Sequence, residues 1–407
     1  MSLINSFDIK DGRNIDAFSR LRVSNPVYQF DSQFTYDLQS LLFEQITLNS
    51  GASIVHDTIN RIAVMTFSST PTGGKAIMQS YEWFKYQAGR GQLMFTTFDF
   101  NEGVPDVIKF AELGDGINAY GFRMNGLIPE FYILSGTQNG NEIAPQSSWN
   151  QDKLDGLGKS GYSLDISKEQ ILVLDFQALY TGRVRMGFDI GGNIVYCHEF
   201  LHSNMVEHPY IQNASLPIRV GMTCTGTVST TMSFNCSAVI SEGGSFEDIG
   251  GYNFSVEGNV TAGNGADTHI LSLRPKTTFN GITNRYKFIL DSLEFLVTGN
   301  SSILWKLCLG QLISGTTTYI NANTTYSGFE YNTLGTISGS PSIVIAQGYV
   351  ASAATSKGAF SNKIANKYPI TLSSANLVRS LGTLSVLVQG IGGGSATRCV
   401  ANYREIR

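Results

Sequence analysis

The chain has 407 residues, of which 42% are hydrophobic and 15% are charged, and it contains 43 glycines but only 10 prolines. This composition excludes an intrinsically disordered chain, a collagen-like repeat and a coiled coil. With 28 Lys and Arg residues against 32 Asp and Glu residues, the formal net charge is −4, which gives no overall attraction toward nucleic acid or anionic membrane. We therefore expect neither nucleic-acid binding nor membrane insertion.

The N-terminus and the cysteines argue against export and against a metal site. Residues 1–23 place charges every few positions where a signal peptide needs an apolar stretch, and no later segment has about 18 unbroken apolar residues. The five cysteines are an odd number, lie far apart and form no C-x-x-C pair. They predict buried free thiols rather than a disulfide framework or a zinc site, and we expect no cofactor.

In chain order, the sequence predicts one short helix followed by many strands. Residues 32–45 space Phe and Leu side chains at helical intervals after a cap at Asp31 or Ser32. Later segments are short, alternate hydrophobic with polar residues, are rich in Val, Ile, Thr, Phe and Tyr, and are separated by glycine turns, as is typical of strands. Residues 183–200 predict a hairpin that turns at Gly191-Gly192.

This order of elements favours an all-β protein of two β-sandwich domains of the jelly-roll kind. Strand patterning lapses between Ser241 and Tyr252. We predict an N-terminal arm with a short helix over residues 1–45, a first β-sandwich domain over 46–245 and a second β domain over 250–407. The second domain is poorer in charge and richer in Ser, Thr, Asn and Gly, a composition typical of stretches that pack tightly in multimers.

The segment HEFLHSNMVEH contains the H-E-x-x-H core of zinc peptidases. On a helix, His198 and His202 would bind zinc and Glu199 would activate a water molecule. His208 would be the third ligand, at the metzincin distance. However, the preceding residues predict a strand, on which positions i and i+4 lie about 13 Å apart, and the glycine of the metzincin motif is missing. We favour histidines at a strand end that hold no metal, and keep the zinc site as an alternative.

Other catalytic patterns are weaker. The paired carboxylates of a glycoside hydrolase come from separate strands, so sequence spacing does not identify them. Candidates such as Asp165, Asp175, Asp189 and Glu199 exist, but strand alternation alone would place about half of such residues on solvent, and we favour a role other than catalysis for them. No phosphate-binding loop, nucleophile elbow or dinucleotide fingerprint is present.

Four large side chains are candidates for surface or interface contacts. Trp83 lies in an aromatic run, and we favour core or subunit packing over sugar or protein binding. Trp149 is bracketed by turn formers, which favours loop anchoring over a receptor contact. Arg183 and Arg185 share one strand face and either pair with carboxylates of a neighbour or remain solvated.

The stretch DAFSRLRVSNPVYQFDSQFTYD, residues 16–37, resembles the N-terminal signature of a family of virion structural proteins of tailed phages and some large DNA viruses. Residues 146–202, which begin QSSWNQDKLDG, are similar to the central region of that family, and residues 213–222 to the segment after it. The resemblance covers roughly the first 240 residues in order and does not extend over the C-terminal domain. It implies a particle component and provides no catalytic residue.

The first block of this resemblance predicts a virion-anchoring arm. Residues 19–24 alternate apolar and basic positions, as an extended arm that adds a strand to a neighbour would do, and an ordinary first strand of the domain is the alternative. The residues expected to anchor are Phe18, Arg20, Leu21, Arg22 and Val23.

Together these observations predict a phage virion structural protein, a fibre, spike, tail or capsid-decoration component, that is not an enzyme. We expect it in the virion, bound to other virion proteins and to itself as a homo-oligomer, with a trimer as the first guess. The N-terminal part would attach to the particle, and the C-terminal domain would project and contact a host surface glycan or protein. The alternatives are a particle-borne hydrolase, zinc peptidase-like or glycan-cleaving, and a purely scaffolding head or baseplate joint.

Overall fold

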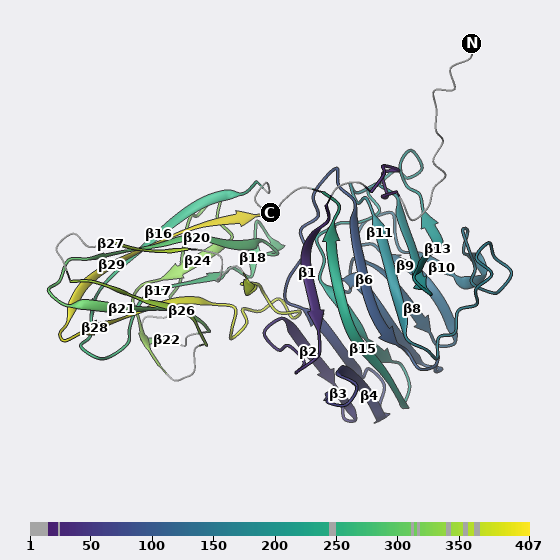
Figure 1. Cartoon of the computed structure of the whole chain (residues 1–407), viewed down its shortest axis with the longest axis horizontal. Coiled ribbons are helices and arrows are strands. Elements are labelled where there is room, and N and C mark those ends of the chain that lie inside the picture. Colours follow the sequence, from purple (N-terminus) through teal and green to yellow (C-terminus); the bar gives the residue numbers. More distant parts are fainter. Residues whose placement is uncertain are drawn as a thin grey trace, which may run out of the picture. The chain divides into compact units, whose positions relative to one another are not determined.

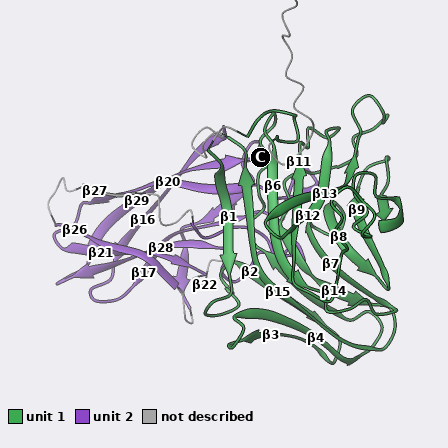
Figure 2. Cartoon of the chain, turned by 45° about the vertical axis from the view of Figure 1, so that its right-hand side comes forward, with its two compact units in different colours: residues 1–248 green, residues 249–407 purple. Residues whose placement is uncertain are grey.

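The computed structural model describes residues 15–22, 25–243, 250–310, 313–315, 318–338, 343–352, 357–361 and 367–407 (Figure 1). These residues form β-strands with no α-helix among them. No helix of this described part is long and apolar enough to cross a membrane. The chain divides into two compact units, unit 1 over residues 1–248 and unit 2 over residues 249–407 (Figure 2). The prediction of an all-β protein with β-sandwich domains is confirmed.

Unit 1 contains an eight-stranded antiparallel sheet with the strand order β13-β12-β11-β6-β15-β4-β3, in which β1 also pairs with β15. Its strands are β1 (Val27–Gln33), β3 (Ala52–Asp57), β4 (Ile62–Thr70), β6 (Gln92–Asp99), β11 (Gln170–Phe176), β12 (Val184–Ile190), β13 (Asn193–Phe200) and β15 (Val228–Ser241).

The second sheet of unit 1 has seven strands in the order β10-β9-β8-β7-β14-β5-β2. They are β2 (Phe43–Leu48), β5 (Lys75–Ser80), β7 (Val107–Gly114), β8 (Ala119–Asn125), β9 (Ile128–Leu134), β10 (Glu142–Pro145) and β14 (Ile218–Cys224), and a 3₁₀ turn, η1 (Gln146–Ser148), follows β10. One hydrophobic core contains side chains of both sheets, which therefore pack face to face.

Alternation along each strand determines which side chains enter this core. In β4, Ala63, Met65 and Phe67 are buried in the core, whereas the residues between them are more exposed. Successive side chains of a strand point to opposite faces, so the intervening residues lie on the other side of the sheet. We call that side of the eight-stranded sheet the outer face.

The predicted hairpin over residues 183–200 is present as β12 and β13. Ile190 pairs with Asn193, so the turn consists of Gly191 and Gly192. Both glycines have positive φ, +60° and +78°, as a two-residue turn of type I′ requires.

The predicted helix over residues 32–45 is absent. This segment instead ends β1, turns, and begins β2, so it connects the two sheets of unit 1. Phe34 and Phe43 both enter the core, where each ring packs within 6 Å of Phe234. Gln39 adopts a positive φ of +48°, which breaks any helix between them.

Unit 2 is a second antiparallel sandwich, with four-stranded and six-stranded sheets around its own core. The first sheet, in the order β16-β29-β20-β27, consists of β16 (Tyr252–Ala262), β20 (Lys287–Val297), β27 (Lys357–Ser361) and β29 (Ser395–Ile406). The second, in the order β23-β24-β17-β28-β21-β26, consists of β17 (Thr268–Pro275), β21 (Ser302–Leu309), β23 (Ile320–Asn321), β24 (Phe329–Asn332), β26 (Ile343–Val350) and β28 (Leu384–Ile391). Two small hairpins accompany them, β18 (Thr278–Phe279) with β19 (Ile282–Thr283), and β22 (Ile313–Gly315) with β25 (Gly335–Ile337).

Candidate functional site

The N-terminal segment, residues 15–22, folds back onto unit 1. Ile15 and Leu21 form an isolated antiparallel bridge, so the segment is a closed turn rather than an extended strand. Oδ1 of the buried Asp16 accepts the backbone N–H groups of Phe18 and Arg20, each at 2.9 Å. Its Oδ2 pairs with the Arg20 guanidinium at 2.6 Å. Val23, which was also predicted to anchor the arm, lies outside the described residues.

An ion network fixes this segment to the outer face. Its centre is Asp175 on β11, whose side chain is fully buried. Oδ2 of Asp175 accepts hydrogen bonds from Arg22 at 2.6 Å, from Arg185 at 2.5 Å and from the Tyr196 hydroxyl at 2.6 Å. Arg185 also donates to the Ile15 carbonyl at 2.9 Å, which joins the network directly to the turn.

Arg183, which directly precedes β12, contacts the same turn. Its guanidinium donates to the Ala17 carbonyl at 3.2 Å and to the Ser19 hydroxyl at 3.3 Å. It also lies 3.6 Å from the Glu199 carboxylate. Arg183 and Arg185 were expected to contact a neighbouring chain or solvent. In the structure they bind the N-terminal segment of their own chain.

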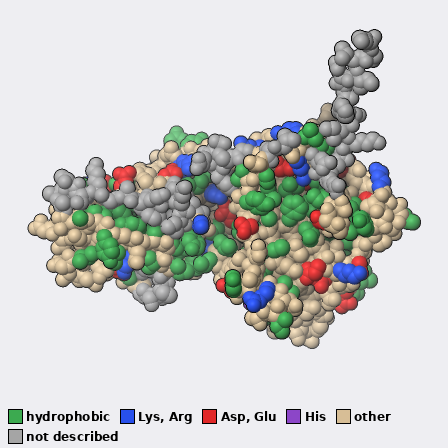
Figure 3. Space-filling view, in the orientation of Figure 1, with side chains coloured by type: hydrophobic (Ala, Val, Ile, Leu, Met, Phe, Trp, Pro, Cys, Tyr) green, Lys and Arg blue, Asp and Glu red, His purple; other side chains and the backbone are tan. Residues whose placement is uncertain are grey.

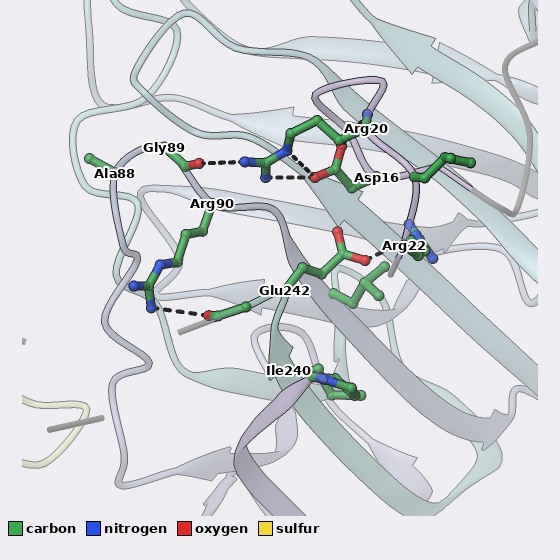
Figure 4. Close-up of a pocket in the computed structure, with 12 residues that line it drawn as sticks. Asp16, Arg20, Arg22, Ala88, Gly89, Arg90, Ile240 and Glu242 are labelled. Carbon is green, nitrogen blue, oxygen red and sulfur yellow. Dashed lines mark hydrogen bonds and ion pairs between the residues drawn. The ribbon is translucent and has the colours of Figure 1, made fainter. Parts of the chain in front are cut away.

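Glu242 closes the network beside a cavity of about 680 Å³ (Figure 4). One oxygen of its carboxylate lies 3.0 Å from Nε of Arg22. Burial, together with the nearby negative charges of Asp175 and Asp16, raises the pKa of Glu242 to about 7 although two arginines oppose the shift.

The structure does not bring His198, Glu199, His202 and His208 together in the arrangement of a zinc peptidase. His198 and Glu199 lie on strand β13 and not on a helix, and no group of three or more His, Cys, Asp or Glu side chains in the described residues could hold a metal ion. Burial lowers the pKa of His198 to about 4. Both ring nitrogens of His202 have partners, the Gly182 carbonyl at 2.8 Å and the Glu142 carboxylate at 3.0 Å. His208 is exposed.

The two tryptophans singled out in the sequence belong to the interior of unit 1. Trp83 is 3% exposed and Trp149 is 2% exposed. The Trp149 indole donates to the Ala144 carbonyl at 3.0 Å, and its ring packs 4.5 Å from that of Phe131. Neither ring offers a surface to a ligand in this structure.

A polar hollow of about 500 Å³ on the outer face was not predicted from the sequence. Asp99 at the end of β6, Glu169 just before β11, and Ser233 and Asn235 on β15 line it. The Asn235 amide donates to Glu169 at 3.0 Å. Burial raises the pKa of Glu169, and the charge of Asp99 adds to the rise. These residues come from three separate segments with no characteristic spacing, so no sequence signal identified them.

An apolar cluster lies next to this hollow on the same face. Leu93, Val173 and Ile240 are buried there beneath the partly buried Phe95 and Tyr196. Figure 3 shows hydrophobic side chains gathered on this side of unit 1. The outer face therefore runs from the ion network through an apolar strip to the polar hollow.

No protein-family model matches the chain, and no curated protein is significantly similar to it. Several solved structures resemble part of it. One is an endo-1,3-beta-glucanase from Streptomyces sioyaensis, with 11% identity, covering 54% of this chain and 97% of that chain at a TM-score of 0.37. Another is a glycosyl hydrolase family protein from Mycobacterium fortuitum, with 12% identity, covering 52% of this chain and 99% of that chain at a TM-score of 0.36.

At this level of identity the likeness concerns the fold alone. A protein of unknown function from Shewanella oneidensis MR-1 is about equally similar, with 11% identity, covering 55% of this chain and 89% of that chain at a TM-score of 0.35. The prediction that the chain is not an enzyme is contradicted, since glycoside hydrolases are among the structures that it resembles.

Proposed function

We propose that the chain is a structural component of a virus particle, a fibre, spike, tail or decoration protein. One observation carries this proposal. The two sequence blocks on which the resemblance to virion proteins rests, residues 16–37 and 146–202, meet in a single ion network. Arg22 belongs to the first block, and Asp175, Arg185 and Tyr196 belong to the second.

Such a network suits a protein that attaches by its N-terminal part. The ion pairs and hydrogen bonds hold residues 15–22 at one place on unit 1, so the attachment segment is presented in a fixed orientation. Buried charges tolerate few alternative arrangements, because each lost pairing leaves an uncompensated charge. In this proposal unit 1 attaches to other virion proteins. Unit 2 projects toward a host surface glycan or protein, and the chain assembles with itself, with a trimer as the first expectation.

Particle incorporation tests this proposal. An epitope-tagged full-length chain is expressed in infected host cells, and the particles are purified on a density gradient. Mass spectrometry and immunogold labelling of those particles should find the chain at a constant copy number at one place on the particle. The Arg22→Ala variant should be incorporated less. Absence of the wild-type chain from purified particles would overturn the proposal.

A second candidate is a particle-borne, glycan-cleaving enzyme. The observation that favours it is the presence of two carboxylates, Asp99 and Glu169, in one hollow. Burial and the charge of Asp99 raise the pKa of Glu169. Glycoside hydrolysis needs one carboxyl group that remains protonated to act as the acid and a second that remains ionised. We expect the wild-type chain to release reducing ends from one of a panel of polysaccharides. This activity should be lost in Glu169→Gln and retained in Asn253→Ala. Unchanged activity in Glu169→Gln would rule this site out.

A further inference from the structure

We propose that the outer face of unit 1 binds a neutral saccharide chain, with the hollow between Asp99 and Asn235 as its principal subsite. This site is additional to the particle attachment proposed above, and it does not require that the bound saccharide be cleaved. It places a glycan contact on unit 1, separate from the host contact proposed above for unit 2.

This hollow is one of two adjacent hollows that lie along the neighbouring strands β6 and β15. A second hollow, of about 360 Å³, shares Asn60, Ile62 and Asn235 with the first and extends to Phe95. Strands β6 and β15 pair side by side beneath both. From Asp99 to Phe95 is four residues of strand, or about 13 Å at the usual rise, so this pair of hollows is suited to an extended ligand rather than a compact one.

The first hollow holds a buried polar atom that lacks a partner. Oδ1 of Asn235 is buried and has no hydrogen-bond partner within the described residues, although the amide nitrogen of the same side chain donates to Glu169. Ser233, which is 8% exposed, also lines this hollow. Buried polar groups are normally hydrogen-bonded, and a donor on a ligand would satisfy the Asn235 oxygen.

The charge of the lining selects the ligand class. Asp99 and Glu169 are the charged residues that line the first hollow. The second hollow is lined by one residue of each sign, Asp31 and Arg61, and the Arg61 guanidinium donates to the Thr35 carbonyl at 2.7 Å. Anionic ligands such as phosphates and sulfated glycans are therefore repelled from the first hollow, the principal subsite. Carboxylates accept hydrogen bonds from hydroxyl groups, and the amides of Asn60 and Asn101 both donate and accept. An uncharged, hydroxyl-rich ligand matches this combination.

Phe95 supplies the apolar contact that a sugar ring requires. Its ring is partly buried against the cluster of Leu93, Val173 and Ile240, so its orientation is fixed by packing. The ring borders the second hollow, within reach of a chain seated in the first. Ligand sites commonly combine an apolar wall with a few polar groups of this kind.

Calorimetry and ligand-observed NMR on the full-length chain test the proposal. The probes are short neutral β-glucan and mannan oligosaccharides, the same oligosaccharides after sulfation, and Ca²⁺ alone. We expect a neutral oligosaccharide to bind and its sulfated form to bind at least about tenfold more weakly. Binding of Ca²⁺ alone, or stronger binding of the sulfated form, would overturn the proposal.

Variants locate the site on the outer face. Asn235→Ala and Phe95→Ala should each weaken binding by about tenfold, whereas Asn253→Ala, an exposed asparagine of unit 2, should leave it unchanged. Thermal unfolding of each variant separates loss of binding from loss of the fold. Equal loss in all three variants would overturn the assignment. Binding that persists without any release of reducing ends would support the site and refute the enzymatic candidate, so the two proposals fail separately.

Discussion

Arg22 donates a hydrogen bond of 2.6 Å to the buried carboxylate of Asp175, which lies 153 positions further along the chain. Arg185 and Tyr196 bind the same oxygen atom, so a single carboxylate pairs with one arginine of the N-terminal segment and one of β12. This relationship ties the start of unit 1 to the middle of its eight-stranded sheet.

Removing the charge of Asp175 should destabilise unit 1 strongly. Asp175→Asn leaves Arg22 and Arg185 without their common counter-charge, and breaking a buried ion pair in this way costs about 3–5 kcal/mol. Urea unfolding followed by tryptophan fluorescence measures the loss. The control is Arg398→Ala, which breaks an exposed pair with Glu257 in unit 2 and should cost less than about 1 kcal/mol. Similar costs for both variants would contradict the importance of the network.

The stability of unit 1 should fall as pH rises through about 7. The pKa of Glu242 is raised in the folded state, so the folded state binds this proton more tightly than the unfolded chain does. The resulting stabilisation is complete below the unfolded value of about 4.5 and is lost as pH rises through the folded value. Glu242→Gln keeps a neutral side chain at every pH and should flatten this dependence. Denaturant unfolding across that pH range measures this dependence. If the unfolding free energy of Glu242→Gln varied with pH as steeply as that of the wild type, the prediction would be refuted.

Unit 2 should lose stability in acid through His269. Burial lowers the pKa of this histidine to about 4, although the hydrogen bond between its ring and the Gly335 carbonyl opposes the shift. The unfolded chain takes up the proton near the ordinary value of 6.5, so the stabilisation is complete above 6.5 and is lost as pH falls toward 4. An NMR titration of the His269 ring protons measures the pKa directly. A midpoint near 6.5 would contradict the prediction.

Gly187→Ala should disrupt the hairpin of β12 and β13. A Cβ atom at this position would lie 2.0 Å from the Val195 carbonyl oxygen and 2.7 Å from the Cα of Tyr196, both backbone atoms that cannot rotate away. Overpacking of this kind costs about 1–3 kcal/mol. Gly250→Ala, where a Cβ meets nothing within 4 Å, is the matched control. Denaturation midpoints that shift equally in both variants would contradict the prediction.

Cys236 should react first with a thiol reagent in the native protein. The five cysteines are free, as predicted, and four of them are buried, whereas Cys236 is partly exposed. Burial raises the pKa of the Cys197 and Cys399 thiols, which suppresses the reactive thiolate. Mass spectrometry after brief alkylation should find Cys236 modified and the other four only after unfolding. Early modification of Cys399 would contradict this.

The local pattern of the sequence predicted the strands but not the path between them. Alternation such as that around Met65 on β4 determines which face is buried, and it is visible in a single segment. The helix predicted over residues 32–45 failed because Phe34 and Phe43 are spaced for packing against Phe234, a residue about 200 positions away. Helical spacing in a short segment cannot reveal such a partner.

The candidate sites were predictable only in part. Arg22 and Arg185 were singled out as charged residues of one arm and one strand, but their common partner Asp175 appeared only as an unpaired candidate carboxylate. The hollow around Asp99 and Asn235 had no sequence signal, because sheet pairing alone brings its residues together. Contacts between distant strands carry no periodic signature in the sequence.

The closed turn of residues 15–21 also has a mechanical consequence. Tension applied through the start of the chain reaches this turn before it reaches β1, which is held by a ladder of hydrogen bonds to β15. The contacts of Arg22, Arg183 and Arg185 would break first and lengthen the chain by several residues while both sheets stay intact. A protein tethered by this end would therefore yield under load in a short initial step and recover its contacts when the load is removed.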